Sequence, residues 1–415
     1  MQNITRYLEN KRDPNTIDKI KCALEALHLK IDPAKVIVVA GTNGKGSTCA
    51  TLHKLLIASG RNVGFFSSPH LIKANERIKY NDKDILDEDF YKIFEIVHKK
   101  VCDFNLSYFE YLTLMAVQYF FDEKNVDYAI FEVGLGGSYD ATNAIPHDIS
   151  VITRLGMDHE TILGDNLLRI AQNKLGIVSF RNKVFHSKFH DEKVTELSQL
   201  ISEKLQAELI EAYTYDYTVD KTSKYPSFGI RTQWGDFKMN LQGQRAAENT
   251  SLALTIFNYL IDGNIQQFIP AIAEVNWPGR MEMIHYKNRD IFLSGDHNPQ
   301  GIQSLLDILQ FYNFKNIHFI VGICNDKRYS EMLLKLTNFE KSHIYLTETP
   351  EKTLAIKDYD EVFRKSAIFV SANPIKALDA AILNANEEDL IIITGSLYLV
   401  GKIKSLIQID PLSRK

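Results

Sequence analysis

The sequence predicts an α/β fold built as two domains with mostly parallel sheets. The chain has 415 residues, more than the roughly 100 to 200 residues of a single domain. Short runs of β-branched and aromatic residues alternate with longer segments of helical periodicity, which is typical of parallel sheets covered by helices. The alternation occurs twice, and Pro278 and Gly279 lie between the two regions. These two residues mark the predicted hinge between the domains.

Five β-rich runs predict the strands of the first sheet. Residues 87–101 and 108–124 place apolar residues at i, i+3 and i+4 spacing, so they predict two helices that cover this sheet. The five runs are KVIVVA (35–40), NVGFF (62–66), VDYAIFEV (126–133), DISVIT (148–153) and NKVFHS (182–187).

The pattern changes from about residue 208 to residue 241, where alternating segments joined by turn residues predict an antiparallel hairpin region. A helix is expected from about Arg245 to Leu260. A second α/β region then covers roughly residues 281 to 415. Its predicted strands are DIFLSGD (290–296), NIHFIVGI (316–323), SHIYLT (342–347), SAIFV (366–370) and DLIIITG (389–395).

Composition excludes several functional classes. Lys and Arg total 48 and Asp and Glu total 52, a net charge of -4, which argues against wholesale binding to nucleic acid or to acidic membranes. The four cysteines contain no C-x-x-C pair, which favours a reduced compartment, so a cytoplasmic protein is expected. Residues 1–15 lack an apolar signal core, and no apolar run approaches the ~18 residues needed to span a bilayer.

The segment VAGTNGKGST (39–48) predicts a site for nucleotide phosphate. A strand that feeds a glycine-rich turn and then a helix presents backbone N–H groups and the positive helix end to an anion. Lys45 adds positive charge, and Ser47 or Thr48 offers a hydroxyl to Mg²⁺. The spacing departs from G-x-x-x-x-G-K-[ST] because position 39 is valine, so an ordinary glycine turn remains an alternative. The residues expected at the nucleotide are Gly41, Thr42, Asn43, Gly44, Lys45, Gly46, Ser47 and Thr48.

The loop variant G-T-x-G-K-x-[ST] resembles that of the Mur ligase superfamily, ATP-dependent enzymes that join an amino acid to a carboxylate. Further motifs resemble folylpolyglutamate synthase and dihydrofolate synthase in order and spacing over nearly the whole chain. The resemblance implies a P-loop ATPase-like domain over residues 1–278 and a smaller Rossmann-like α/β domain over residues 279–415. The motifs are FSSPHL (66–71), NERI (75–78), FEYLT (109–113), EVGLGGSYDATN (132–143), DHETILG (158–164), NKLGI (173–177), WPGRME (277–282), HNPQG (297–301) and GSLYLVG (395–401).

Two acidic or basic side chains follow predicted strands, where α/β sheets place their ligands. Glu132 ends the run DYAIFE, and His159 comes just past VITRLGMD. Without the motifs they would be interpreted as a solvated carboxylate and a hydrogen-bonded loop histidine. The resemblance implies that Ser47 and Glu132 hold the Mg²⁺ on the ATP phosphates and that His159 helps hold a second metal ion. It also implies that Lys174, otherwise a surface helix lysine, carries a carbamate whose anionic oxygen suits a hard cation.

The resemblance implies a reaction in two steps. ATP phosphorylates the carboxylate of a pterin or folate, and the amine of glutamate then attacks the acyl phosphate. Lys45 and the metals would stabilise charge on the phosphoryl group. A two-domain cleft enzyme of this kind fits a monomer with small-molecule partners. The remaining expected site residues are Asn249 and Arg280 at the nucleotide, His297 (alternatively a turn histidine that caps a helix) and Ser396 near glutamate, and Ser68, Pro69 and His70 in a pterin-side loop.

Three positions depart from the resembling family. Ser294 stands where an acidic residue is usual, so Asp296 is expected either to contact the nucleotide in its place or to leave that contact weakened. Arg245 stands where histidine is common, and Ser138 replaces an arginine close to the metal site. An amide ligase for another carboxylate is therefore the second hypothesis, and a non-catalytic nucleotide-binding protein is the third.

Overall fold

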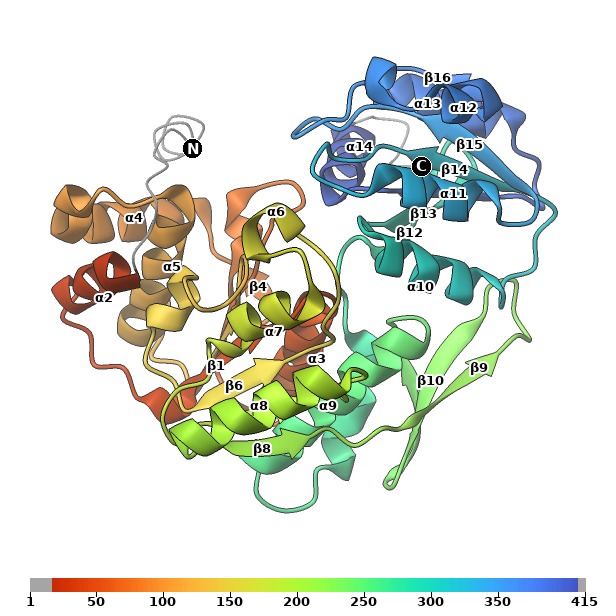
Figure 1. Ribbon diagram of the computed structural model, residues 1–415. Helices are drawn as coiled ribbons and strands as arrows, with labels where there is room; N and C mark the ends of the chain where they lie inside the picture. The colour runs from red at the N-terminus through yellow and green to blue at the C-terminus, as the bar shows by residue number, and fades with distance from the viewer. Residues whose placement is uncertain (1–16, 410–415) are drawn as a thin grey trace. The chain divides into compact units, whose positions relative to one another are not determined.

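The computed structural model describes residues 17–409 (Figure 1). The chain forms two compact units. The N-terminal unit runs to Tyr215 and includes Glu248–Glu274, and the C-terminal unit comprises Asp216–Ala247 and the chain from Val275 onward. Within residues 17–409, none of the helices combines the length and the apolar character that crossing a membrane requires.

The N-terminal unit is built on an eight-stranded sheet of order β4-β3-β2-β5-β1-β6-β7-β8. Strands β2, β5, β1, β6, β7 and β8 are parallel, whereas β3 and β4 are antiparallel additions at one edge. All five predicted strands are confirmed. The strands are β1 (Val36–Ala40), β2 (Val63–Phe66), β3 (Ile78–Tyr80), β4 (Lys83–Asp84), β5 (Tyr128–Glu132), β6 (Ile149–Ile152), β7 (Lys183–His186) and β8 (Glu208–Glu211).

The start of the predicted hairpin region was wrong. Residues 208–211 form β8, which pairs parallel with β7 at the edge of the large sheet. The antiparallel strands begin only at Asp216. The short sequence ELIE alternates polar and apolar residues like a hairpin strand, because an edge strand exposes one face in either setting.

Helices cover both faces of this sheet, and the two predicted ones begin with clear signals. Helix α4 has Asp87, Glu88 and Asp89 in its first turn, where acidic side chains favour the helix dipole. Helix α5 starts with a capping box, in which the Glu110 carboxylate accepts from the Ser107 N–H at 2.6 Å. The helices are α2 (Ile17–Ala26), α3 (Lys45–Ala58), α4 (Asp87–Val101), α5 (Tyr108–Gln118), α6 (Glu160–Leu163), α7 (Leu167–Leu175), α8 (Glu192–Leu205) and α9 (Gln244–Leu260), with π turn Tyr119–Glu123 after α5 and 3-10 turns Pro33–Lys35, Ala74–Arg77, Cys102–Phe104, Ala141–Ala144 and Gln266–Glu274.

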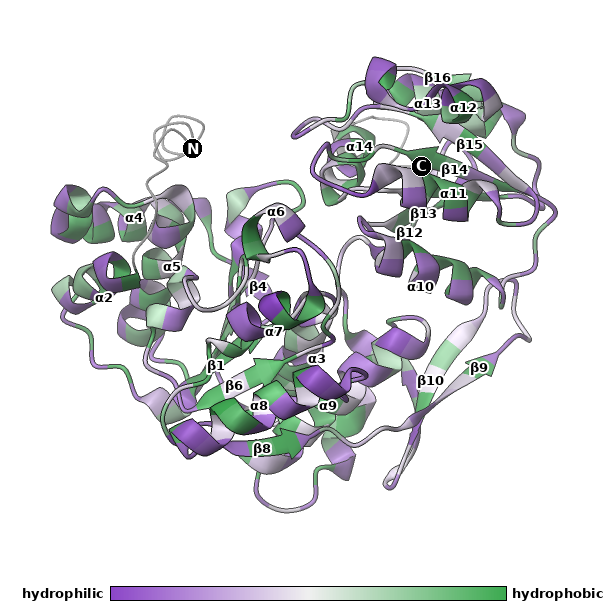
Figure 2. Cartoon of the chain, viewed as in Figure 1, coloured by the Kyte–Doolittle hydropathy of each residue, from purple (hydrophilic) through white to green (hydrophobic). Residues whose placement is uncertain are grey.

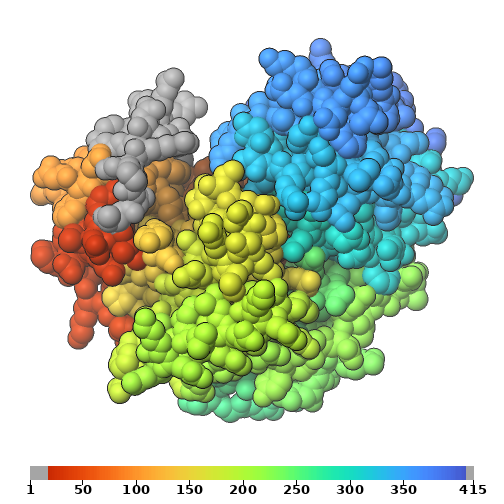
Figure 3. Space-filling view, viewed as in Figure 1, coloured from red at the N-terminus to blue at the C-terminus, as the bar shows by residue number. Residues whose placement is uncertain are grey.

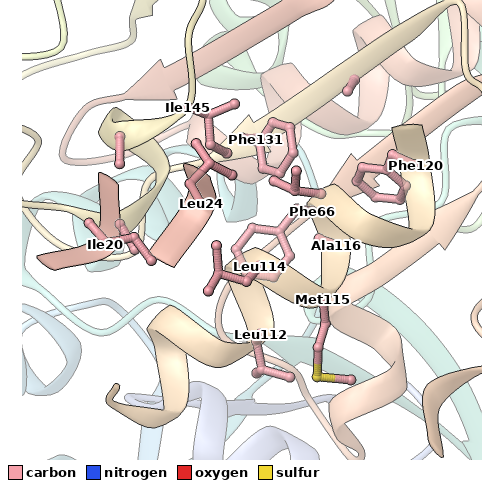
Figure 4. Packing of buried hydrophobic residues seen from close by; sticks show 14 of the residues in the cluster. Ile20, Leu24, Phe66, Leu112, Leu114, Met115, Ala116, Phe120, Phe131 and Ile145 are labelled. Carbon is pink, nitrogen blue, oxygen red and sulfur yellow. The ribbon is translucent and has the colours of Figure 1, made fainter. Parts of the chain in front are cut away.

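The main apolar core lies between the sheet and helices α2, α4 and α5. Figure 4 shows Leu24 of α2 and Leu114 of α5 near Phe66 and Phe131 from strands β2 and β5, and all four side chains are buried. Strand β1 is buried at all five positions, as expected of a parallel strand covered on both faces. Figure 2 shows the same hydrophobic character along β6. This core holds the carboxyl ends of β1 and β5 in fixed register.

The C-terminal unit contains a six-stranded sheet of order β12-β13-β17-β14-β15-β16 and a three-stranded antiparallel sheet of order β11-β10-β9. The six-stranded sheet is parallel apart from β12, and its five predicted strands are confirmed. Its elements are β9 (Asp216–Asp220), β10 (Ser227–Thr232), β11 (Gly235–Met239), β12 (Arg280–Tyr286), β13 (Arg289–Ser294), α10 (Pro299–Leu309), β14 (Ile317–Val321), α11 (Tyr329–Thr337), β15 (Ser342–Leu346), a 3-10 turn (Ile356–Asp358), α12 (Glu361–Ser366), β16 (Phe369–Val370), α13 (Pro374–Asn384), β17 (Leu390–Thr394) and α14 (Leu397–Ile409).

The compact units and the predicted domains differ over one segment. The predicted limits 1–278 and 279–415 assign the three-stranded sheet to the first domain, whereas Asp216–Ala247 belongs to the C-terminal unit. Helix α9 begins in one compact unit and ends in the other. The domain limits themselves stay a prediction.

Candidate active site

The turn between β1 and α3 accepts only glycine at two positions. Gly41 has φ of 152°, and Gly44, the N-cap of α3, has φ of 94°. A Cβ on Gly41 would lie 1.8 Å from Oγ1 of Thr153, and one on Gly44 would lie 2.2 Å from the side-chain oxygen of Asn249. Both space and backbone conformation therefore require glycine. The structure brings the predicted residue Asn249 directly against the loop.

The two halves of this loop have different roles. The N–H groups of Thr42 and Asn43 donate to the Arg154 carbonyl at 3.0 and 3.3 Å, which ties the first half to the chain after β6. The first bond within α3 runs from Thr48 N–H to Gly44 O at 2.9 Å. The first four N–H groups of a helix have no partner within it. The donors available to a phosphate are therefore those from Gly44 to Ser47.

Two lysines converge on one carbonyl of the loop. The Nζ atoms of Lys45 and Lys174 donate to Gly41 O at 3.1 and 2.9 Å. Lys174 is only 4% exposed, so the interpretation as a surface lysine was wrong. Burial, and then the charge of Lys45, lower the pKa of Lys174 from 10.5 to about 7 against the opposing charges of Asp158 and Asp140. A large fraction of its amine is therefore unprotonated at neutral pH.

Glu132 lies on the strand next to the loop. It ends β5 opposite Val39 of β1, is 4% exposed, and accepts a hydrogen bond from the Ser68 N–H at 3.2 Å. The interpretation as a solvated carboxylate was therefore wrong. Burial, and then the Glu132 charge, raise the pKa of the Cys49 thiol, while the Lys45 charge opposes them. Glu132 and Lys45 thus act on the same small region beside α3.

Asp158 was not predicted as a site residue, although it precedes His159. Its carboxylate is buried and accepts from the His159 N–H at 2.9 Å. His159, with φ of 51°, is the N-cap residue of α6, and its side chain is 30% exposed. Figure 3 shows the α6 segment, in yellow, at the molecular surface. Because the Asp158 charge raises the pKa of Lys174, this turn faces the buried amine.

The loop that follows β5 packs on the end of α7 that carries Lys174. A Cβ on Gly137 would lie 2.7 Å from the Asn173 carbonyl oxygen. The backbone N–H and hydroxyl of Ser138 both donate to this same oxygen, at 2.9 and 3.0 Å. Asp140, also not predicted, holds the loop by accepting from the N–H groups of Gly134 and Leu135 at 3.0 and 2.9 Å. Ser138 thus caps a helix end instead of supplying charge.

Among residues 17–409, no three His, Cys, Asp or Glu side chains gather as a metal site. The predicted ligand set contains only two such residues, Glu132 and His159, together with the Ser47 hydroxyl and modified Lys174. Thr48 is fully buried, so the hydroxyl of Ser47, at 9% exposure, is the more accessible of the two candidates. These oxygen donors and the imidazole suit a hard divalent cation that also takes ligands from phosphate.

The predicted pterin-side segment is ordered by two charged residues of the NERI motif. The Glu76 carboxylate accepts the N–H groups of Leu71, Ile72 and Lys73 at 2.7, 3.0 and 3.0 Å. The Arg77 Nε donates to Nδ1 of His70 at 2.9 Å. Ser68 contacts Glu132, and Pro69 lies between these two contacts.

His70 therefore contacts Arg77 as a neutral acceptor. Burial, and then the Arg77 charge, lower the pKa of His70 to about 4. The Arg77 guanidinium lies 5.5 Å from the ring centroid of Tyr108. Phe109 lies 5.5 Å, centroid to centroid, from Phe66, and a Cβ on Gly134 would lie 2.7 Å from it. The motifs NERI and FEYLT were the sequence signal for these side chains, which the prediction did not include.

In the C-terminal unit, the predicted residues gather where β13 ends. The Ser294 hydroxyl donates to the Asp296 carboxylate at 2.5 Å, and Nδ1 of His297 lies 3.0 Å from the Gly295 carbonyl oxygen. Asn298, not His297, caps α10 by accepting from the Gly301 N–H at 2.8 Å, so the alternative role of His297 as the cap was wrong. Ser294 and Asp296, the two unusual residues, are thus directly bonded.

Ser396 and Arg280 lie on neighbouring elements of the same unit. Ser396 follows β17 and is 1% exposed, and its hydroxyl accepts from the Tyr398 N–H at 3.1 Å and lies 3.4 Å from the Cys324 sulfur. Arg280 was expected in the hinge but begins strand β12, where it pairs with Ser294. Parallel strands place ligands at their carboxyl ends, and Arg280, Ser294 and Ser396 all lie at that edge.

Comparisons with known proteins agree with this arrangement. Residues 39–257 match the Mur ligase middle domain, and residues 279–397 match the Mur ligase glutamate ligase domain. The dihydrofolate synthase/folylpolyglutamate synthase of Buchnera aphidicola subsp. Acyrthosiphon pisum (strain APS) is 31% identical over 415 residues, with 97% of each chain covered. The chain is a member of the dihydrofolate synthase/folylpolyglutamate synthase family. This confirms an ATP-dependent ligase that joins glutamate to pterin or folate substrates.

Two solved structures of this family share the fold. E. coli FolC in complex with DHPP and ADP is 26% identical with a TM-score of 0.83, and the match covers 98% of this chain and 97% of that one. A bifunctional folylpolyglutamate synthase/dihydrofolate synthase with Mn, AMPPNP and L-glutamate bound has a TM-score of 0.83 at 24% identity, with 98% of each chain covered. Its likeness at this identity shows the fold alone. The predicted fold class is thereby confirmed.

Proposed function

We propose that this family member acts both as a dihydrofolate synthase and as a folylpolyglutamate synthase. It would join L-glutamate to dihydropteroate and to reduced folates through an acyl phosphate. The observation that carries the proposal is the convergence of Lys45 and buried Lys174 on the Gly41 carbonyl, in the loop next to Glu132. This arrangement offers a cation, a reactive amine and a carboxylate around one phosphate site.

The nucleotide would bind with its phosphates on the N–H groups from Gly44 to Ser47. These donors and the start of α3 attract negative charge, and Lys45 adds a full positive charge. Asn249, 2.2 Å from the position of a Gly44 Cβ, would contact the base side. Arg280 would reach the phosphates from the C-terminal unit, and Asp296 would accept from the nucleotide in place of an acid at position 294.

Glu132, Ser47, His159 and the modified Lys174 would hold divalent metal ions. When bound, such ions neutralise charge on the phosphates of ATP. The unprotonated amine of Lys174 adds to the carbon of CO₂ and releases a proton, which leaves a carbamate with anionic oxygens. The pKa of about 7 supports this step, because the protonated amine has no lone pair.

The bond changes are those of carboxylate activation and amide formation. A carboxylate oxygen of the acceptor forms a bond to the γ-phosphorus as the bond to the leaving ADP breaks. The nitrogen of glutamate then bonds to the acyl carbon, loses a proton and expels phosphate. His297 is the predicted group for this proton, because its Nδ1–H bonded to Gly295 O leaves Nε2 as the acceptor in the neutral ring. Ser396 would help to bind the incoming glutamate.

The acceptor would lie along the segment of Ser68, Pro69 and His70. The Arg77 guanidinium, held by His70 and next to Tyr108, offers paired donors beside aromatic rings. Such a combination suits a flat heteroaromatic molecule with a carboxylate. The cytoplasmic location and the monomeric state predicted from the sequence stay predictions, and residues 1–16 lie outside the described part of the chain.

Phosphate release tests the proposal. Purified protein with ATP, Mg²⁺ and glutamate is supplied with dihydropteroate, with tetrahydrofolate, or with neither, and Lys45→Ala is the control that should abolish turnover. Turnover with both acceptors supports the bifunctional assignment. Turnover with one acceptor alone restricts the proposal to that activity. Lack of turnover with both, in protein that binds ATP, would favour another carboxylate acceptor, which the departures at Ser138 and Ser294 suggest.

A further inference from the structure

The backbone on either side of Arg280 adopts an unusual conformation. Gly279 has φ of 72° and Met281, which is buried, has φ of 52°. Left-handed φ is uncommon for a residue with a large side chain. The pairing of β12 with β13 also shifts its register between Arg280 and Glu282. The turn and bulge therefore aim Arg280 in a direction that a regular strand would not give.

One ion pair holds this bulge. The Glu282 carboxylate accepts from the Gly279 N–H at 3.0 Å with one oxygen and from Lys404 of α14 with the other. The two side chains are 18% and 13% exposed. The Gly279 carbonyl also accepts from the Gly295 N–H at 2.7 Å. The backbone before Arg280 is thus bonded on both sides, to Glu282 and to the end of β13.

The guanidinium of Arg280 has its own fixed neighbour. A Cβ on Gly295 would lie 2.9 Å from Arg280 Nη1 and 2.2 Å from Cδ2 of Leu397. The guanidinium therefore rests on the glycine backbone, close to Leu397. Leu397 begins helix α14, and Lys404 lies on the same helix. Helix α14 thus contacts the Arg280 segment at two points.

We propose that Glu282 and Lys404 are positioning residues for Arg280. They hold the bulge in the conformation that presents the guanidinium to the phosphates of ATP. An exposed ion pair contributes little to a protein, but this pair is mostly shielded and also takes a backbone N–H. The inference rests on the proposed contact between Arg280 and ATP.

Steady-state kinetics of Glu282→Gln and Lys404→Met test the inference. Each variant should raise KM for ATP at least about fivefold and lower kcat, while KM for glutamate and for the pterin acceptor stays within about twofold. Lys404→Arg keeps the charge and should recover most of the loss. Lys402→Met, at an exposed position of the same helix, is the matched control and should leave all constants unchanged.

The effect must be separated from lost folding and from a wrong role for Arg280. Equal losses for all substrates together with a lower Tm would overturn the inference, because they indicate a structural role only. Arg280→Lys distinguishes the two proposals. If it leaves KM for ATP unchanged, the proposed role of Arg280 fails. If it raises that KM while Glu282→Gln and Lys404→Met do not, only the positioning inference fails.

A double variant gives the sharpest test. If Lys404 acts through Arg280, Arg280→Lys combined with Lys404→Met should raise KM for ATP no more than Arg280→Lys alone. Effects that multiply would show that Lys404 acts independently of Arg280, and the inference would be wrong.

Discussion

Lys174 combines burial with a neighbouring positive charge, and this decides its chemistry. Its pKa of about 7 makes the unprotonated amine more abundant as pH rises from 6 to 8. Protein equilibrated with ¹³C-bicarbonate should therefore show a carbamate NMR signal that grows over this interval. Lys174→Met should abolish that signal and nearly all activity. A carbamate signal that persists in this variant would place the modification elsewhere.

The same shift predicts how Lys174 affects stability. Between pH 7 and 10.5 the unfolded chain binds a proton at this lysine that the folded chain has lost. The free energy of unfolding should therefore rise with pH across this interval, and below about pH 7 the full cost of the buried charge is present. Urea unfolding at several pH values without CO₂ measures this slope. Lys174→Met should reduce it, and an unchanged slope would contradict the lowered pKa.

Gly44 combines left-handed φ with a close neighbour, so two effects of its replacement can be separated. Gly44→Ala should weaken ATP binding at least ~10-fold, because the new Cβ collides with Asn249 at the phosphate donors. Gly60→Ala is the matched control, since Gly60 has φ of 82° and no atom within 4 Å of its Cβ position. The control should cost about 1 kcal/mol of stability through backbone strain alone and keep ATP affinity.

At the scale of elements, the loop after β5 and the end of α7 act as one unit around Lys174. Ser138→Ala removes a donor to the Asn173 carbonyl and should cost about 1 kcal/mol of stability. It should also lower the ¹³C-carbamate occupancy of Lys174 and reduce kcat severalfold, with KM for ATP unchanged. Ser198→Ala is the control, because it removes a hydroxyl bonded to a helix carbonyl in α8. Equal carbamate occupancy in both variants would leave Ser138 with a structural role only.

Elements were predictable where burial alone decides the residue pattern. Strands β1, β5 and β17 are short apolar runs buried on both faces, so their sequences have few other interpretations. Edge strands were not predictable in this way. The two residues of β4 are Lys83 and Asp84, and strand β12 begins at a glycine turn that favoured a hinge.

For the whole molecule, the sequence predicted which residues matter better than how they are held. The glycines and Lys45 follow from the local needs of a phosphate loop. The low pKa of Lys174 does not, because it depends on packing by Gly137 and Ser138 and on the charge of Asp158, each distant in sequence from Lys174 or unremarkable alone. The bond between Ser294 and Asp296 likewise turns two separate departures into one joined feature.

Each compact unit has its own sheet and core, so calorimetry of the whole chain should resolve two unfolding transitions without ligand. If the nucleotide contacts the N-terminal loop and also Arg280, Mg²⁺ and ADP should raise both transitions, by about 2.7 kcal/mol in total at 100 times Kd. Lys45→Ala should abolish the shift, and Arg280→Lys should reduce it for the C-terminal unit alone. A nucleotide that moves only one transition in the unmodified protein would contradict the contact with Arg280, because a ligand stabilises only the unit whose folded state it binds.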